Sequence, residues 1–178
     1  MSGHSKWSQI KHKKSLTDAQ RSKEFAKLAR QITLAAKEKG PDPAMNPALR
    51  TAVDKARAAN MPSDNIERAV KKVSGGDKQI LEEVVFECYG PGGAAIIIEG
   101  ITDNKNRTAQ EVKHLLTEHG AKLAAPGSAR FLFQKEDGGW RASSPVPVGK
   151  EDKEKLLKLL EALDGQDDIN DIYTNAEL

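Results

Sequence analysis

The sequence VVFECYGPGGAAIIIEGI, from Val84 to Ile101, marks the point where the chain changes from helical to strand patterning. Two apolar runs, Val84–Tyr89 and Ala94–Ile101, flank the tetrapeptide Gly90-Pro91-Gly92-Gly93. Short runs rich in β-branched and aromatic residues are typical of strands, whereas Gly and Pro relieve or preset the backbone angles of a turn. The stretch therefore predicts an antiparallel hairpin and places a sheet in this part of the chain.

Three segments before the hairpin have the 3.6-residue periodicity of amphipathic helices. The first is expected to run from Thr17 or Asp18, either of which can cap it, to Lys39. The second follows Asn46, which has a proline after it, and the third begins near Pro62-Ser63. Helices this short are not stable alone, so we expect them to pack into one small three-helix domain.

The residues after the hairpin predict two further helices and two further strands. The helices are Thr108–His119, opened by a capping box, and Lys153–Leu163. The strands are Arg130–Lys135 and Ile169–Thr174. Between them, Glu136–Lys150 is rich in Gly, Ser and Pro and is expected to be a linker or a long loop. The pattern predicts an α+β multidomain protein, in which a ferredoxin-like α+β domain, a sheet packed on two helices, follows the three-helix domain.

The net charge changes sign close to the predicted boundary between the helical and the α+β parts of the chain. The pair Gly75-Gly76 ends the third helix, so we expect residues 1–76 to form a basic arm plus the three-helix domain and residues 77–178 to form the α+β domain. Residues 1–78 hold 17 Lys and Arg against 8 Asp and Glu, whereas residues 79–178 hold 11 against 18, which gives net charges of +9 and −7. This segregation indicates that the first half meets a polyanion.

The arm Gly3–Lys14, GHSKWSQIKHKK, contains four lysines, two histidines and no acidic residue. Such a segment is expected to stay extended and solvated until it meets an anion, and a solvated charge run at a mobile terminus is the alternative. We interpret it as an arm that lies on nucleic-acid phosphate, with Trp7 either stacking on a base or pinning the arm to the protein.

The first predicted helix adds a basic ridge opposite its apolar face, and together the arm and the ridge supply the candidate nucleic-acid-binding residues. These are Lys6, Trp7, Lys11, His12, Lys13, Lys14, Arg21, Lys23, Lys27 and Arg30.

Two further places are candidates for contact with a second partner. In the Gly90-Pro91-Gly92-Gly93 turn, with Tyr89 before it, backbone N–H groups can approach a phosphate or a peptide closely, although a plain turn is the safer interpretation. Asn106 and Arg107 lie at the start of a predicted helix, where anions bind well, and simple solvent exposure is the alternative there.

The sequence carries no pattern that predicts catalysis, a metal or a cofactor. His114 and His119 are five residues apart on a helix, which does not place them on one chelating face. Cys88 is expected to be a small buried residue, and paired acids such as Asp167-Asp168 to be solvated. We therefore expect a protein that is not an enzyme and has no metal site and no small-molecule substrate.

The expected location is the cytoplasm. No apolar run approaches the roughly 20 residues that span a bilayer, so we expect no membrane partner. A single cysteine excludes an internal disulfide framework and fits a reducing compartment.

Several long motifs, in the right order, resemble the YebC family, which comprises probable transcriptional regulatory proteins of bacteria and is related to a mitochondrial translational activator. The motifs are GHSKWSQIKHKK, Asp18–Ile32, Asn46–Ala69, YGPGG at Tyr89–Gly93 and TDNKNRT at Thr102–Thr108. The resemblance implies a cytoplasmic, non-enzymatic, nucleic-acid-associated protein with a helical first domain and α+β second and third domains. The third domain, normally inserted near Lys135, is expected to be missing here, with residues 136–150 in its place.

Members of that family are described in two ways, and both remain open. Our leading hypothesis is a ribosome-associated translation factor that binds RNA, with ribosomal RNA favoured, through the basic N-terminal domain and relieves stalling. The alternative is a DNA-binding transcriptional regulator, which needs Arg, Asn or Gln aimed at base edges. A protein-interaction module whose basic half is incidental is the third hypothesis.

Overall fold

The computed structural model describes residues 5–11, 15–76 and 80–178, which form two compact units. The helical unit lies within residues 14–82. The α+β unit takes in residues 83–178 together with residues 1–13. This differs from the expected division in one respect, because the N-terminal segment belongs with the α+β unit and not with the three helices.

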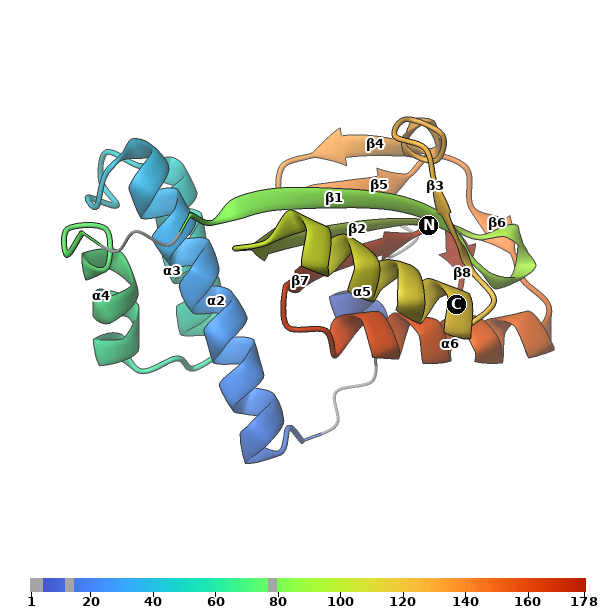
Figure 1. Cartoon of the computed structure of the whole chain (residues 1–178), viewed down its shortest axis with the longest axis horizontal. Helices are drawn as coiled ribbons and strands as arrows, with labels where there is room; N and C mark the ends of the chain where they lie inside the picture. The colour runs from blue at the N-terminus through green and yellow to red at the C-terminus, as the bar shows by residue number, and fades with distance from the viewer. Residues whose placement is uncertain (1–4, 12–14, 77–79) are drawn as a thin grey trace. The chain divides into compact units, whose positions relative to one another are not determined.

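The helical unit contains α2 (Asp18–Lys39), α3 (Pro47–Ala58) and α4 (Ser63–Lys71), as the sequence pattern predicted (Figure 1). Thr17 caps α2 in a reciprocal capping box with the residue three positions on. Asn46 caps α3 by accepting a hydrogen bond from the backbone N–H of Leu49 at 3.0 Å. The local capping signals therefore set where these helices begin.

The core of the helical unit forms where the apolar stripe of α2 meets α3 and α4. Ile32, Leu49 and Ala56 have no exposed surface, and Phe25 and Leu28 pack around them half-buried. The buried amide of Asn46 donates to the carbonyls of Ala35 and Gly40 at 2.8 and 2.9 Å, which ties the end of α2 to the start of α3.

The α+β unit is built on a four-stranded sheet in the order β3-β1-β2-β7. Its strands are β1 (Glu82–Tyr89), β2 (Ala95–Thr102), β3 (Lys122–Ala124) and β7 (Ile169–Thr174). Its helices are α1 (Trp7–Ile10), α5 (Lys105–Glu118) and α6 (Lys150–Asp164), with short 3-10 turns η1 (Pro91–Gly93) and η2 (Arg130–Leu132). The remaining strands are β4 (Phe133–Glu136), β5 (Gly139–Ala142), β6 (Val146–Pro147) and β8 (Ala176–Glu177).

The strand order confirms the α+β class. The crossover from β2 through α5 leads to β3, and β1 lies between these two strands, which is the split β-α-β arrangement of ferredoxin-like sheets. β7 then pairs antiparallel with the other side of β2, with Ile97 opposite Tyr173. The β2–β7 register shifts at Gly100, where a Cβ atom would collide with the carbonyl oxygen of Asp168, so only glycine fits.

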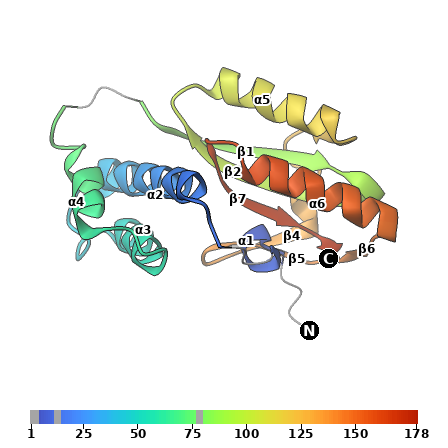
Figure 2. The ribbon, with the colours of Figure 1, turned by 90° about the horizontal axis from the view of Figure 1, so that it is seen from below.

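Both faces of the sheet are covered, which explains the near-continuous apolar run in β2. Figures 1 and 2 show α5 and α6 on one face and the β4–β5 hairpin on the other. Ile96 and Ile98 belong to the core on the helix side, together with Leu116 of α5 and Leu160 of α6. Ala95, Ile97 and Tyr173 belong to a second core, completed by Phe133 and Trp140 of the hairpin. Alternate residues of one strand therefore serve two cores.

The structure corrects two sequence-based expectations in this unit. The segment 136–150 is not a plain linker, because it contains β5 and β6; Gly138 and Gly139, with φ of 93° and 148°, close the β4–β5 turn. Helix α5 begins at Lys105 and not at Thr108, because Asn104 caps it by accepting from the N–H of Arg107 at 3.1 Å.

Candidate nucleic-acid interface

A basic stripe runs along α2 on the side opposite its apolar face. Lys23, Lys27 and Arg30 are spaced four and three residues apart, which places them on one side of the helix, and the exposed Lys37 continues the line. Each of the first three also takes part in an interaction within the protein. The stripe is therefore a row of partly engaged cations, interrupted by the buried Leu34 between Arg30 and Lys37, and its positive charge is the property that a phosphate chain would meet.

Arg21 does not join this stripe. It lies two residues before Lys23, which at 100° per residue turns it toward the side of Phe25 and Leu28. There it lines a cavity with Glu24 and Phe25. The structure therefore separates Arg21 from the three other α2 residues that the sequence analysis grouped with it.

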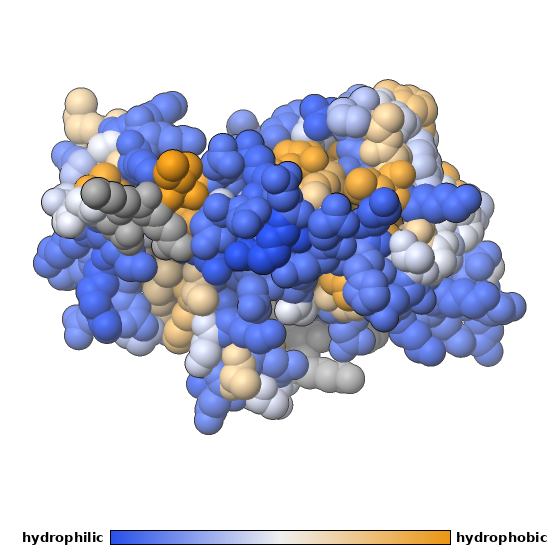
Figure 3. Space-filling model, viewed as in Figure 1, coloured by the Kyte–Doolittle hydropathy of each residue, from blue (hydrophilic) through white to orange (hydrophobic). Residues whose placement is uncertain are grey.

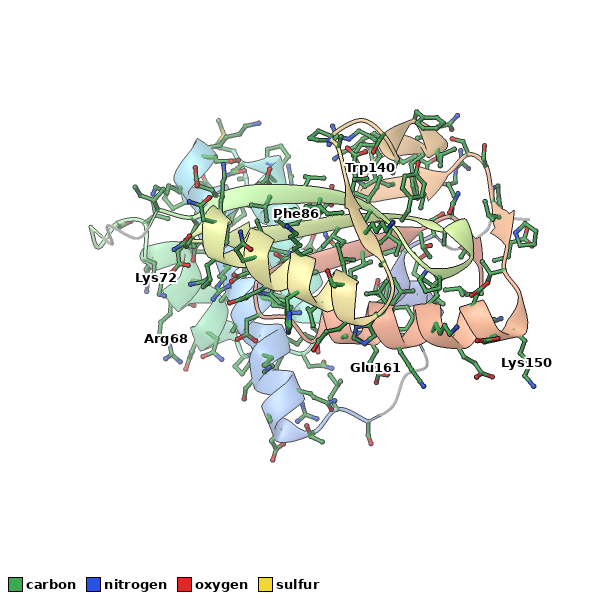
Figure 4. The ribbon with its side chains drawn as sticks, turned by 45° about the vertical axis from the view of Figure 1, so that its right-hand side comes forward. Arg68, Lys72, Phe86, Trp140, Lys150 and Glu161 are labelled. Atoms are coloured by element: carbon green, nitrogen blue, oxygen red, sulfur yellow. The ribbon has the colours of Figure 1, made fainter. Side chains whose placement is uncertain are left out.

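Further cations lie on the other two helices of this unit. Arg50 and Lys55 are exposed on α3, and Figure 4 shows Arg68 on α4 and Lys72 just after it at the surface. Residues 14–82 contain 14 Lys and Arg against 9 Asp and Glu, so the helical unit is net positive even without the N-terminal segment. In Figure 3 hydrophilic residues cover most of the face shown, and hydrophobic residues appear only as small separate patches.

The N-terminal segment is folded onto the α+β unit and is not an extended arm over residues 5–11. Lys6 pairs with Tyr173 as an isolated β-bridge, and its Nζ lies 2.8 Å from Asp171 Oδ1 and 5.5 Å from the centre of the Tyr173 ring. Lys11 Nζ lies 2.9 Å from Asp164 Oδ2. Both lysines are therefore already neutralised by acids of the unit on which they lie.

Trp7 is only 7% exposed and belongs to the core between the sheet and α6. Of the two roles considered for it, the structure shows the pinning role, because a buried indole has no free face on which a base can stack. Its Nε1–H has no hydrogen-bond partner in the described part of the chain. His12, Lys13 and Lys14, which complete the predicted arm, lie outside the described residues.

The glycines after Tyr89 have an internal structural reason. A Cβ on Gly92 would lie 2.9 Å from Val148 Cγ1, and a Cβ on Gly90 would lie 3.1 Å from Ile96 Cδ1. The φ of Gly92 is 71°, which also favours glycine. Tyr89 donates its hydroxyl hydrogen to the carbonyl of Ser128 at 2.6 Å. Close packing therefore accounts for Gly90 and Gly92, and contact of the motif with a second partner stays a prediction.

Arg107 is held by a buried carboxylate, whereas Asn106 beside it is exposed. Arg107 Nη2 lies 2.8 Å from Asp168 Oδ2, and the hydroxyl of Thr108 donates to the same oxygen at 2.8 Å. The hydrogen bond and the negative charge of Asp168 raise the pKa of the Arg107 guanidinium. The expectation of a solvated Asp167-Asp168 pair is wrong for Asp168, whose side chain is 2% exposed.

Sequence reasoning missed a second buried carboxylate, that of Glu87 on β1. Its two oxygens accept hydrogen bonds from the backbone N–H groups of Gly127, Ala129 and Arg130 at 2.8, 2.9 and 2.8 Å. Burial raises the pKa of Glu87, but the three backbone hydrogen bonds and the nearby Arg130 guanidinium more than offset this and leave it lowered. An acid inside an apolar strand run was the signal available in the sequence.

The described residues hold no group of three or more His, Cys, Asp or Glu side chains that could bind a metal ion. Cys88, predicted to be buried, has no exposed surface, and burial raises the pKa of its thiol to about 12. None of the helices in the described ranges is long and apolar enough to cross a bilayer.

Comparison with known proteins identifies relatives over nearly the whole chain. Residues 5–76 match the sequence model of the TACO1/YebC protein N-terminal domain, and residues 81–138 match that of the TACO1/YebC second and third domain. A probable transcriptional regulatory protein of Lactobacillus delbrueckii subsp. bulgaricus is 47% identical over 181 residues, which cover 99% of this chain and 74% of the relative. A protein of the same description from Lactobacillus acidophilus is 45% identical over 98% of this chain and 73% of its own length.

A solved structure has the same fold. The crystal structure of a conserved hypothetical protein from Aquifex aeolicus superposes with a TM-score of 0.84 at 35% sequence identity, over 96% of each chain.

Proposed function

The chain belongs to the TACO1/YebC family, and we propose that it is a non-enzymatic, nucleic-acid-binding regulator of gene expression. The observation that carries the proposal is the concentration of positive charge on the helical unit, where the stripe of Lys23, Lys27 and Arg30 forms a continuous row. The printed names of the relatives, probable transcriptional regulatory proteins, support a regulatory role.

The helical unit is the part that meets phosphate in this proposal. Lys6 and Lys11 are already paired with Asp171 and Asp164, so using them would first require those ion pairs to break. Lysines along a helix neutralise phosphates without reading sequence, because phosphate contacts position a protein and base contacts specify it. The proposed interface therefore recognises the shape and the charge density of the nucleic-acid backbone, and it does not read the base sequence.

We propose RNA on the ribosome, with ribosomal RNA favoured, as the cytoplasmic target, and relief of stalling as the activity. The α2 stripe consists of three lysines and one arginine, and lysine is a flexible point charge suited to phosphate, which favours backbone contact over base readout. A DNA-binding transcriptional regulator remains the second candidate, because the relatives' printed names favour it.

Ribosome co-sedimentation and promoter footprinting separate the two candidates. We expect the wild-type chain to sediment with ribosomes and to leave no discrete footprint on promoter DNA. A footprint without ribosome association would favour the DNA-binding candidate.

A pair of charge reversals locates the interface. Lys23 and Lys37 are exposed on the α2 stripe, and Lys113 and Lys158 are exposed on α5 and α6. The variant Lys23→Glu/Lys37→Glu is expected to lose ribosome association. The control Lys113→Glu/Lys158→Glu changes net charge equally and is expected to keep it. Equal retention by both variants would contradict the proposed interface.

A further inference from the structure

The helical unit contains a cavity of about 550 Å³ between the start of α2 and the turn that joins α3 to α4. Its volume lies within the range of roughly 300–1,000 Å³ that is usual for ligand sites. Leu16, Phe25 and Pro62 form apolar parts of its wall. Leu16 and Pro62 are exposed, so the cavity opens to solvent.

Three polar residues of different chemistry line the same cavity: the basic Arg21, the acidic Glu24 and the amide-bearing Asn60. Among the residues that the structure describes, neither Arg21 nor Glu24 forms an ion pair. They are therefore not committed to each other, although both line one small space. A ligand suited to this lining is a flat ring that carries N–H donors and is attached to an anion. Glu24 can accept hydrogen bonds from the donors, Arg21 can pair with the anion, and the ring can pack on the apolar wall.

Both sides of the cavity are held by helix-capping interactions. On one side, the capping box at Thr17 fixes the start of α2. On the other, Asn60 adopts a φ of 61° just after α3, and its N–H donates to the carbonyl of Arg57 at 2.9 Å. The N–H of Met61 donates to the carbonyl of Ala56 at 3.0 Å, which completes a Schellman ending. The wall is thus set before any ligand arrives.

We propose that this cavity takes one unstacked base of an RNA target, guanine by preference. The base packs on the apolar wall of Phe25 and Pro62, and the carboxylate of Glu24 accepts hydrogen bonds from guanine N1–H and N2–H₂. Arg21 meets the phosphate attached to that nucleotide. Adenine, cytosine and uracil do not present two adjacent N–H donors to a single carboxylate.

This inference rests on the proposed function and adds a base preference to an interface that otherwise contacts only phosphate. It also gives Arg21 a role that its separation from the basic stripe would leave unexplained.

The test uses the full chain and short RNA duplexes that carry no bulge or a single bulged G, A, C or U, with binding followed by fluorescence anisotropy at one salt concentration. The bulged-G duplex is expected to bind about 10-fold more tightly than the unbulged duplex, which is the discrimination usual for one bidentate contact. Glu24→Gln should abolish the preference for G over A. Glu38→Gln, an exposed acid elsewhere on α2, is the matched control and should keep it.

The outcomes separate this inference from the proposed function. Salt-dependent binding with the same affinity for all five duplexes would overturn the base pocket and leave the phosphate interface standing. Retention of the full G preference by Glu24→Gln would also overturn it, as would tighter binding of the corresponding bulged DNA. Absence of binding to all five duplexes would overturn RNA as the proposed target, and the base pocket with it. Circular dichroism of each variant confirms that the helical unit is folded.

Discussion

Replacing Glu87 by glutamine tests whether the buried carboxylate on β1 holds the loop at residues 127–130. The carboxylate has two acceptor oxygens, of which one accepts from Gly127 and the other from both Ala129 and Arg130. Glutamine has the same shape but only one acceptor. Whichever way the amide turns, its NH₂ group replaces one of the two acceptor oxygens. At least one backbone N–H then faces another donor and loses its hydrogen bond.

The expected cost follows from counting these bonds. A hydrogen bond to a charged group contributes about 1.5–3 kcal/mol net, and at least one such bond is lost. The remaining bonds become neutral and fall to roughly half their strength. We expect Glu87→Gln to lower the free energy of unfolding by about 2–4 kcal/mol, a large part of the roughly 5–15 kcal/mol that is usual for a whole protein.

Urea unfolding of the full chain, followed by tryptophan fluorescence, measures this cost as a function of pH. The pKa of Glu87 is lower in the folded state than its ordinary value of 4.5, so the unfolded state binds the proton more readily. The stabilisation is therefore fully present above pH 4.5 and is lost as the pH falls through the lowered folded pKa. The gap between wild type and variant should be constant near neutral pH and shrink in acid.

Two results would refute this reasoning. One is an equal urea midpoint for wild type and Glu87→Gln at neutral pH. The other is a gap between the two proteins that persists undiminished well below pH 4.5, which would mean that the charge of Glu87 is not what the loop uses.

Three further predictions concern other described residues. Trp7→Ala should lower the free energy of unfolding by about 3–5 kcal/mol, because it removes a buried indole. Trp7→Phe should lower it by much less, because that change also removes an N–H without a hydrogen-bond partner among the described residues. An unchanged melting temperature in Trp7→Ala would mean that the N-terminal segment is not packed. Cys88 should react with a thiol reagent at pH 8 only after unfolding, because its pKa is about 12, and rapid labelling of the native protein would contradict its burial. Gly100→Ala should cost about 1–3 kcal/mol through its clash with the Asp168 carbonyl. Gly149→Ala meets no atom within 4 Å and should cost less, about 0.5–1 kcal/mol, because alanine caps α6 less well than glycine. A Gly149→Ala variant with the lower urea midpoint of the two would count against the bulge.

The sequence predicted the helices of the first unit well because their determinants are local. Thr17 and Asn46 sit directly before the apolar stripes that they cap, so a short window contains the whole signal. The same method misplaced the start of α5, because Asn104 and Thr108 are both suitable caps. Thr108 instead donates to Asp168, 60 residues away, and that long-range bond decides between them.

The N-terminal segment shows what a local interpretation leaves out. Four lysines without an acid nearby predict a solvated arm, but Asp164 and Asp171, which pair with Lys11 and Lys6, lie more than 150 residues further along the chain. Strand β5 in the segment 136–150 was missed for a similar reason. It is only four residues long and follows a glycine turn, and it is stabilised by pairing with β4 and by packing of Trp140 in the core against the sheet.

The most direct test of the central claim is the salt dependence of RNA binding by wild type and by Lys23→Glu/Lys37→Glu. If the helical unit engages about four phosphates of single-stranded RNA, the slope of log K against log salt should be roughly −3 for wild type. The loss of two cations should make the variant's slope shallower by about 1.4. The control Lys113→Glu/Lys158→Glu should keep the wild-type slope, and identical slopes for all three proteins would contradict a phosphate interface on α2.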